Sequence, residues 1–182
     1  MRRIAGAALL IALAGCGGHA AAPAPRTFDL GVVPPGARLP ALRVTSLRAV
    51  APFDGVQMVY RLAWRHPSEL ADYAHSRWAA PPAELMRKQV LRAAGEGPAK
   101  CGLEIELQEF TQVFASKEAS EARIELRASL TNSSARIATR GVTIVEPGAG
   151  TDAASGAAAM ARAAERVLGD LAGWIRAQPG CA

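Results

Sequence analysis

Alternation of apolar and polar residues is clearest in the second half of the chain. The segments CGLEIELQEF (101–110) and EARIELRASL (121–130) place apolar residues at alternate positions, and RIATRGVTIVE (136–146) continues the set. A period of two is typical of a β-strand with one buried face. Glu104 and Glu106 then lie on the solvated face, where opposite charges on neighbouring antiparallel strands contribute about 0.2–1 kcal/mol per pair.

Apolar residues at three- and four-residue spacing predict two helices. The first begins at Pro81-Pro82, because proline is tolerated in the first turn, and ends near Gly95. The second spans residues 152–177, with Asp152 as its N-cap. Their apolar faces consist of Leu85, Met86, Val90 and Ala93 in the first helix, and of Met160, Ala164, Val167, Leu168, Leu171, Trp174 and Ile175 in the second.

Three extended segments precede the first helix. They cover residues 26–33, 39–50 and 57–64, and prolines and an Asp54-Gly55 turn separate them. The complete order, β-β-β-α-β-β-β-α, contains runs of strands instead of a strict alternation of strand and helix. We therefore predict a single α+β domain over residues 26–182, with a largely antiparallel β-sheet and two helices packed on one face.

The chain begins with the layout of a secretory signal peptide. Arg2 and Arg3 precede an apolar stretch that is too short for a transmembrane helix, which needs about 20 residues. LAGC, ending at Cys16, resembles the bacterial lipobox, which implies removal of residues 1–15 and acylation of the Cys16 thiol. The alternative is an ordinary signal peptide cut near Ala14.

The residues that follow the cysteine bear on its location. Residues 16–25, CGGHAAAPAP, have the composition of a flexible tether between lipid and domain. In the lipoproteins with this signal, an aspartate after the cysteine favours the inner membrane. Gly17 at that position therefore implies an outer-membrane lipoprotein that faces the periplasm.

The charge of the chain argues against a nucleic-acid partner. The 182 residues carry a formal net charge of +5, and loss of Arg2 and Arg3 leaves 19 basic against 16 acidic residues, or +3. Basic residues are interleaved with acidic ones, and aromatic residues make up only 5%. The sequence thus lacks both the basic stripe and the stacking platforms that nucleic-acid binding needs.

Two cysteines remain once Cys16 is assigned to the anchor. Cys101 and Cys181 would lie beyond the inner membrane, where disulfides persist. We expect an intramolecular disulfide between them, which would stabilise the fold by roughly 4 kcal/mol because it closes a long loop. Free thiols and pairing between chains are the alternatives.

The sequence offers no motif for catalysis, for a metal or for a cofactor. GAGTDA (148–153) matches G-x-G-x-x-A, but a dinucleotide site needs a second parallel strand after the helix, and here the helix is the last element. His66 and His75 lack the spacing and the companions of a metal site. We therefore expect a protein that is not an enzyme and holds no cofactor.

The segment DYAHSRWAAPPAEL (72–85) is the most distinctive in the chain. It brings Tyr73, Arg77 and Trp78 close to the predicted helix start. Tyrosine, tryptophan and arginine are enriched in the energetic centres of interfaces, which makes these three residues a candidate partner-binding surface. The alternative is a core tryptophan and a buried tyrosine that fasten the helix to the sheet.

Several short motifs, taken together with the lipobox, resemble one family. They are FDLG (28–31), MVYRL (58–62), DYAHSRWAAPP (72–82) and LEIELQEFTQVF (103–114). In this order and spacing they are similar to the ABC-type transport auxiliary lipoprotein family (PqiC/YmbA-like lipoproteins). The resemblance covers residues 28 to about 177.

The resemblance implies a role in lipid transport across the envelope. Such lipoproteins accompany systems in which an inner-membrane ABC transporter and a periplasmic MCE-domain assembly move phospholipid or other hydrophobic molecules. The expected partners are an MCE-domain protein, its ABC transporter and the membrane that holds the anchor. Some members of the family form rings, which leaves a homo-oligomer open. A structural lipoprotein that assists envelope or peptidoglycan assembly is the alternative, and a lipid-carrying module is a third hypothesis.

Overall fold

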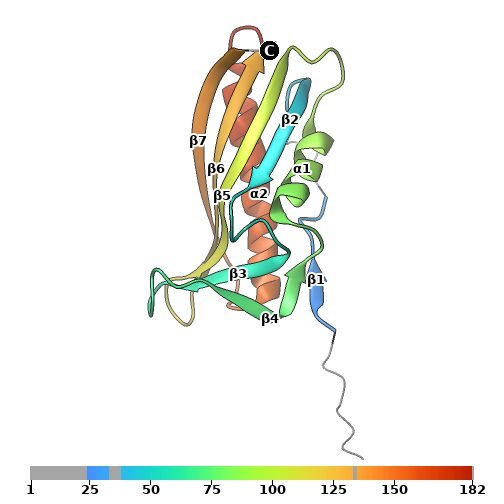
Figure 1. Ribbon diagram of the computed structural model, residues 1–182. Coiled ribbons are helices and arrows are strands. Elements are labelled where there is room, and N and C mark those ends of the chain that lie inside the picture. The colour runs from blue at the N-terminus through green and yellow to red at the C-terminus, as the bar shows by residue number, and fades with distance from the viewer. Residues whose placement is uncertain (1–23, 33–37, 133–134, 182) are drawn as a thin grey trace, which may run out of the picture.

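A computed structural model describes residues 24–32, 38–132 and 135–181. The strands and helices, labelled in Figure 1, are β1 (Arg26–Phe28), β2 (Leu42–Ala49), β3 (Gln57–Leu62), β4 (Ala71–Trp78), α1 (Pro82–Ala93), β5 (Cys101–Phe114), β6 (Ser120–Asn132), β7 (Ala135–Pro147) and α2 (Ala153–Arg176).

All seven strands belong to one sheet, and β5 is its organising strand. One edge of β5 pairs antiparallel with β6, which in turn pairs antiparallel with β7. The opposite edge is shared: β2 pairs parallel with residues 101–107 of β5, and β3 pairs parallel with residues 112–114. β4 pairs antiparallel with β3 and parallel with β1, which extends the sheet at the end where β5 finishes.

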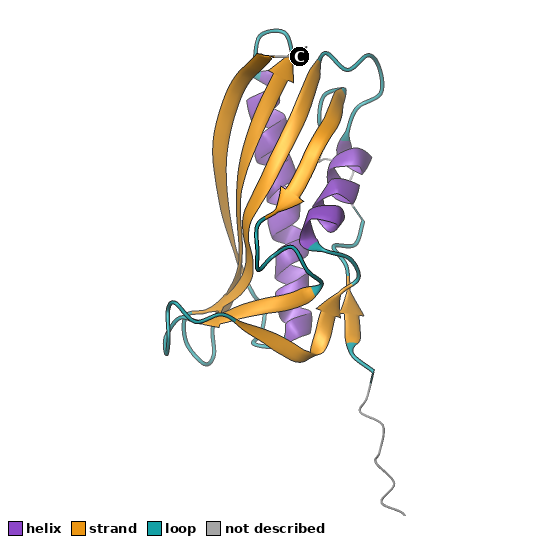
Figure 2. Cartoon of the chain, viewed as in Figure 1, coloured by secondary structure: helices purple, strands orange, loops and turns teal. Residues whose placement is uncertain are grey.

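Both helices pack on the sheet: α2 covers the apolar face of the long strands β6 and β7, and α1 packs against β2. In Figures 1 and 2, α2 runs the length of the molecule behind β5, β6 and β7, and α1 lies beside β2. The alternating apolar residues of β5 and β6 point into this layer, where Leu103, Ile105 and Ile124 are at most 1% exposed. Every residue expected on the two apolar helix faces is buried as well. The alternating apolar residues of the strands and the apolar faces of the helices thus pack together in a single core.

The predicted α+β class is confirmed, and the strand count differs by one. The sequence placed residues 72–78 at the approach to the helix, but they form most of β4, so four strands precede α1. The first strand is also shorter than the predicted 26–33. Asp29 Oδ1 accepts a hydrogen bond from the Gly31 backbone N–H at 2.8 Å, and Gly31 has φ +68°, so the chain turns directly after Phe28.

The two helix starts follow the sequence prediction. Pro82 occupies the first turn of α1, where its missing N–H costs nothing. Asp152 caps α2, since its Oδ1 accepts a hydrogen bond from the Ser155 backbone N–H at 2.7 Å. That bond holds the pKa of the Asp152 carboxyl below its ordinary value.

Candidate functional site

Tyr73, one of the three candidate partner residues, belongs to a polar network inside the molecule. Its half-buried hydroxyl donates a 2.8 Å hydrogen bond to Gln112 Oε1, and its ring centroid lies 4.8 Å from that of Tyr60. Burial raises the pKa of the Tyr73 hydroxyl above its ordinary value, since the phenolate would lose hydration. Tyr73 therefore ties β4 to β5.

Gln112 extends this network to the start of α2. Its side chain is 3% exposed, and its Nε2 donates to Ser120 Oγ at 2.9 Å and to the Asp152 carbonyl at 3.3 Å. Ser120 Oγ in turn donates to the Gly150 carbonyl at 2.6 Å. These bonds order the loop before α2, the segment with the G-x-G-x-x-A match, through contacts within the protein itself.

The other two candidates lie in opposite environments. Trp78 is 3% exposed and packs edge to face on Phe110, with ring centroids 5.3 Å apart. Trp78 is therefore a core tryptophan, which was the alternative to a role in partner binding, and its ring is not available to a partner. Arg77 is exposed, and its Nε lies 3.5 Å from Thr27 Oγ1 on β1. The structure thus leaves Arg77 as the member of the trio that points to solvent.

A charged groove on the open face of the sheet was not singled out from the sequence. It has a volume of about 220 Å³ and is lined by Ser46, Arg48, Glu104, Ile105, Glu106, Arg127, Ser129 and Arg136. The alternation of the strands places these polar residues on one face. Which of them meet depends on the register between strands, which no single segment reveals.

Ion pairs cross this groove from strand to strand. Arg48 on β2 pairs with Glu106 on β5, and Arg136 on β7 approaches Glu104 at 3.8 Å. The hydrogen bond from Arg48 holds the pKa of the Glu106 carboxyl below its ordinary value, and Arg127 adds to this effect through its charge. The groove therefore presents fixed charges of both signs at neutral pH, a pattern suited to a charged protein surface.

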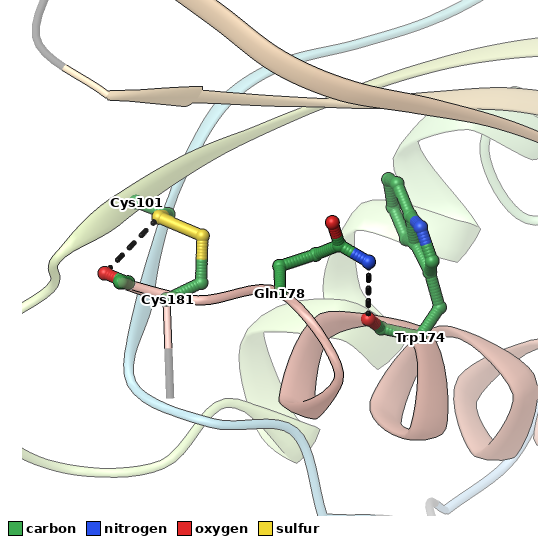
Figure 3. The surroundings of a disulfide bond; sticks show 5 residues. Cys101, Trp174, Gln178 and Cys181 are labelled. Atoms are coloured by element: carbon green, nitrogen blue, oxygen red, sulfur yellow. Dashed lines mark hydrogen bonds between the residues drawn. A yellow bond between two sulfur atoms is a disulfide. The ribbon is translucent and has the colours of Figure 1, made fainter.

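The predicted disulfide is present between Cys101 and Cys181 (Figure 3). Cys101 begins β5 and Cys181 follows α2; the side chains are 1% and 2% exposed, and the Cα atoms lie 5.3 Å apart. The turn after α2 prepares this approach, since the Cys181 backbone N–H donates to the Gln178 carbonyl at 3.2 Å. The bond joins the end of α2 to the beginning of the central strand β5.

A pocket of about 300 Å³ lies at the far end of the sheet, beside the turn between β3 and β4. Its lining residues are Tyr60, Leu62, Arg65, His66, Glu69 and Ala71.

Within the described ranges, no group of three or more histidine, cysteine, aspartate or glutamate side chains is arranged to hold a metal ion. Of the helices that the structure describes, none combines the length and the apolar character needed to cross a membrane. Cys16 lies outside the described residues, so its acylation stays a prediction.

Fold and surface define a small α+β domain with a charged open sheet face, and solved structures share this architecture. The crystal structure of a Xanthomonas campestris protein of the DUF330 family has a TM-score of 0.69 and 27% sequence identity, over 81% of this chain and 92% of that one. The crystal structure of an uncharacterized protein has a TM-score of 0.66 and 11% identity, over 84% of this chain and 99% of the other. The fold is therefore one already seen in proteins of similar size.

Other comparisons add little. A lipoprotein of Neisseria meningitidis reaches a TM-score of only 0.30 at 14% identity, over 74% of this chain and 99% of that one, and this likeness carries no argument. No protein-family model and no curated protein matches the chain.

Proposed function

We propose that this protein is an outer-membrane-anchored auxiliary lipoprotein of an ABC/MCE-type intermembrane lipid transport system. In this role it docks the periplasmic conduit and catalyses no reaction. The observation that carries the proposal is the pairing of a lipobox with the domain itself: LAGC at residues 13–16 precedes by only nine residues an α+β domain whose fold is shared by a DUF330 protein. The transport role rests on the family resemblance of the quoted motifs.

The chemistry of the described surface supports a docking role. The charged groove of β2, β5, β6 and β7 is built on paired strands, so its arginines and glutamates are held in register instead of moving on loops. Fixed charges of both signs select a partner by complementarity and speed its approach. Arg77, on the separate β4 surface, is a second exposed position at which a partner could dock.

Purification from envelopes tests the proposal. The lipidated protein, carrying an affinity tag after residue 182, is isolated from separated inner and outer membranes, and the co-purifying proteins are identified by mass spectrometry. Recovery of an MCE-domain protein with its ABC partners from the outer-membrane fraction supports the proposal. Recovery of peptidoglycan synthases, or residence of the protein in the inner membrane, contradicts it.

The Cys16→Ala variant separates the anchor from the domain. It should fold normally, because the described residues from Arg26 onward form the core without it, but it should carry no lipid and be mislocalised. Incorporation of labelled palmitate into this variant at the wild-type level would exclude Cys16 as the acylated residue.

Charge reversals locate the docking surface. Arg127→Glu changes the charged groove, Arg77→Glu changes the β4 surface, and Arg87→Glu on the exposed side of α1 is a matched control. We expect Arg127→Glu to reduce recovery of the MCE-domain protein at least about tenfold, since like charges at an interface cost several kcal/mol. Equal recovery with all three variants would exclude both surfaces.

A further inference from the structure

One end of the molecule displays a tryptophan to solvent. We define the Trp64 tip as the turn between β3 and β4 (residues 63–70) together with the turn between β5 and β6 (residues 115–119). Trp64 is 44% exposed, whereas Trp78 and Trp174 are 3% and 9% exposed. Trp64 is thus the only one of the three tryptophans, all within the described residues, whose indole reaches solvent to this extent, and an amphipathic indole at a surface is suited to a site that is apolar on one side and hydrated on the other.

The tip is held in place by hydrogen bonds, so Trp64 is presented on an ordered turn. The backbone N–H groups of Arg65 and His66 both donate to the Leu62 carbonyl, at 2.9 and 2.8 Å. The Arg61 guanidinium donates to the Pro67 carbonyl at 3.3 Å and pairs with Glu109 at 3.2 Å.

A cation accompanies the exposed ring. Lys117, on the second turn of the tip, has its Nζ 5.6 Å from the centroid of the Trp64 ring, and both Lys117 and Arg65 are exposed. An indole with an adjacent ammonium group matches the boundary between lipid headgroups and acyl chains, where the ring remains partly hydrated and the cation meets phosphate. The acidic neighbours Glu69 and Glu118 keep the charge of the tip mixed, so the indole supplies most of the attraction.

The position of the tip relative to the chain start selects a membrane as its partner. In Figure 1 the turns of the tip and the first residues before β1 lie at the same lower end of the molecule, and the C-terminal end lies at the top. Residues 17–25 separate Cys16 from β1, and nine residues span at most about 30 Å. An acylated Cys16 therefore holds this end of the domain within about 30 Å of the bilayer, close enough for the tip to reach it.

We infer that the Trp64 tip inserts into the headgroup region of the phospholipid bilayer that holds the acylated Cys16. The inference rests on the lipid anchor of the proposed function. The tip is a second, non-covalent attachment that sets the orientation of the domain, with the Cys101–Cys181 end directed away from the membrane.

Tryptophan quenching by spin-labelled lipid tests the inference. The full lipidated chain is reconstituted into vesicles of phosphatidylethanolamine and phosphatidylglycerol, with or without a nitroxide on the lipid headgroup. Trp64→Phe is the test variant, and Trp174→Phe, near the C-terminal end of α2 and so at the end of the molecule away from the tip, is the matched control. Since Trp64 is one of three tryptophans, we expect the nitroxide to remove up to about one third of the wild-type emission. Trp64→Phe should lose this quenching, and Trp174→Phe should retain it.

Each outcome has a separate meaning. Flotation of the vesicles shows first whether the protein is anchored, and a wild-type chain that does not float overturns the anchor and the inference with it. A wild-type chain that floats without quenching, or a Trp64→Phe chain that is quenched as strongly as wild type, overturns the inference alone. Lys117→Glu serves as a second variant that leaves the indole in place, and it should weaken the quenching at least twofold.

Discussion

Replacement of Gly156 by alanine should destabilise the protein although it improves helix propensity. Gly156 is buried in the first turns of α2, where an added Cβ would lie 2.5 Å from Cδ and 3.0 Å from Nε2 of Gln112. Gln112 then has to leave its place, and its bonds to Tyr73, Ser120 and the Asp152 carbonyl weaken or break. Leaving one or two buried polar groups without a hydrogen-bond partner costs about 1–3 kcal/mol each. The better helix propensity of alanine contributes at most about 1 kcal/mol in return.

The net loss is about 2 kcal/mol, which lowers the melting temperature by about 4–8 °C in a domain of this size. Thermal unfolding followed by circular dichroism measures it. Gly169→Ala is the matched control in the same helix, because an added Cβ there meets nothing within 4 Å. It should raise stability by about 0.5–1 kcal/mol.

The relative stability of Gly156→Ala and Gly169→Ala tests this reasoning. If Gly156→Ala is as stable as Gly169→Ala, the contact with Gln112 does not constrain the helix and the reasoning is refuted. Adding Gln112→Ala to Gly156→Ala removes the overlap, so the two changes together should cost less than their sum. Strict additivity would show that the destabilisation has another origin.

Three further outcomes follow from the structure. The double variant Cys101→Ala and Cys181→Ala should unfold at a temperature lower by about 10 °C, a loss of roughly 4 kcal/mol, and reductant should leave it unaffected but lower the wild-type value. Trp78→Ala should cost about 3–5 kcal/mol in chemical denaturation, because the ring is buried, and a smaller loss than 1 kcal/mol would contradict its role in the core. Glu146→Gln should make the stability of the protein less sensitive to acid. Hydrogen bonds from two arginines of α2 hold the pKa of the Glu146 carboxyl below its ordinary 4.5. The stabilisation from Glu146 is therefore complete above pH 4.5 and is lost as the pH falls through the lower pKa of the folded state. Parallel pH–stability curves for Glu146→Gln and wild type below pH 5 would contradict this.

The fold was predictable wherever a segment carries its own pattern. β5 and β6 alternate strictly over most of their length, and both helices have an apolar stripe, so each of these elements could be recognised without its neighbours. β4 has no such pattern, since ADYAHSRW mixes small, charged and aromatic residues. It is a strand because β1 and β3 bond to its two edges, a condition that exists only in the assembled sheet.

The candidate sites also differ in how far the sequence alone could predict them. Cysteine number and compartment were sufficient to predict the Cys101–Cys181 bond. Exposure could not be inferred for Tyr73, Arg77 and Trp78, because their closeness in sequence says nothing about which side of β4 each occupies or what lies above it. The charged groove depends on three strand registers, and the Trp64 tip on two turns that are about fifty residues apart in the chain.

The Cys101–Cys181 bond also determines how the protein responds to a single cut. The segment it closes contains β5, β6, β7 and α2. Trypsin cleavage after Lys117, in the exposed turn between β5 and β6, therefore yields two pieces that stay covalently joined until the disulfide is reduced. Cleavage after Arg65 lies outside the closed segment and leaves β1, β2 and β3 held by the sheet alone. Cleavage after Lys117 therefore separates the protein into two pieces only when reductant is added, whereas cleavage after Arg65 separates the covalent chain without reductant.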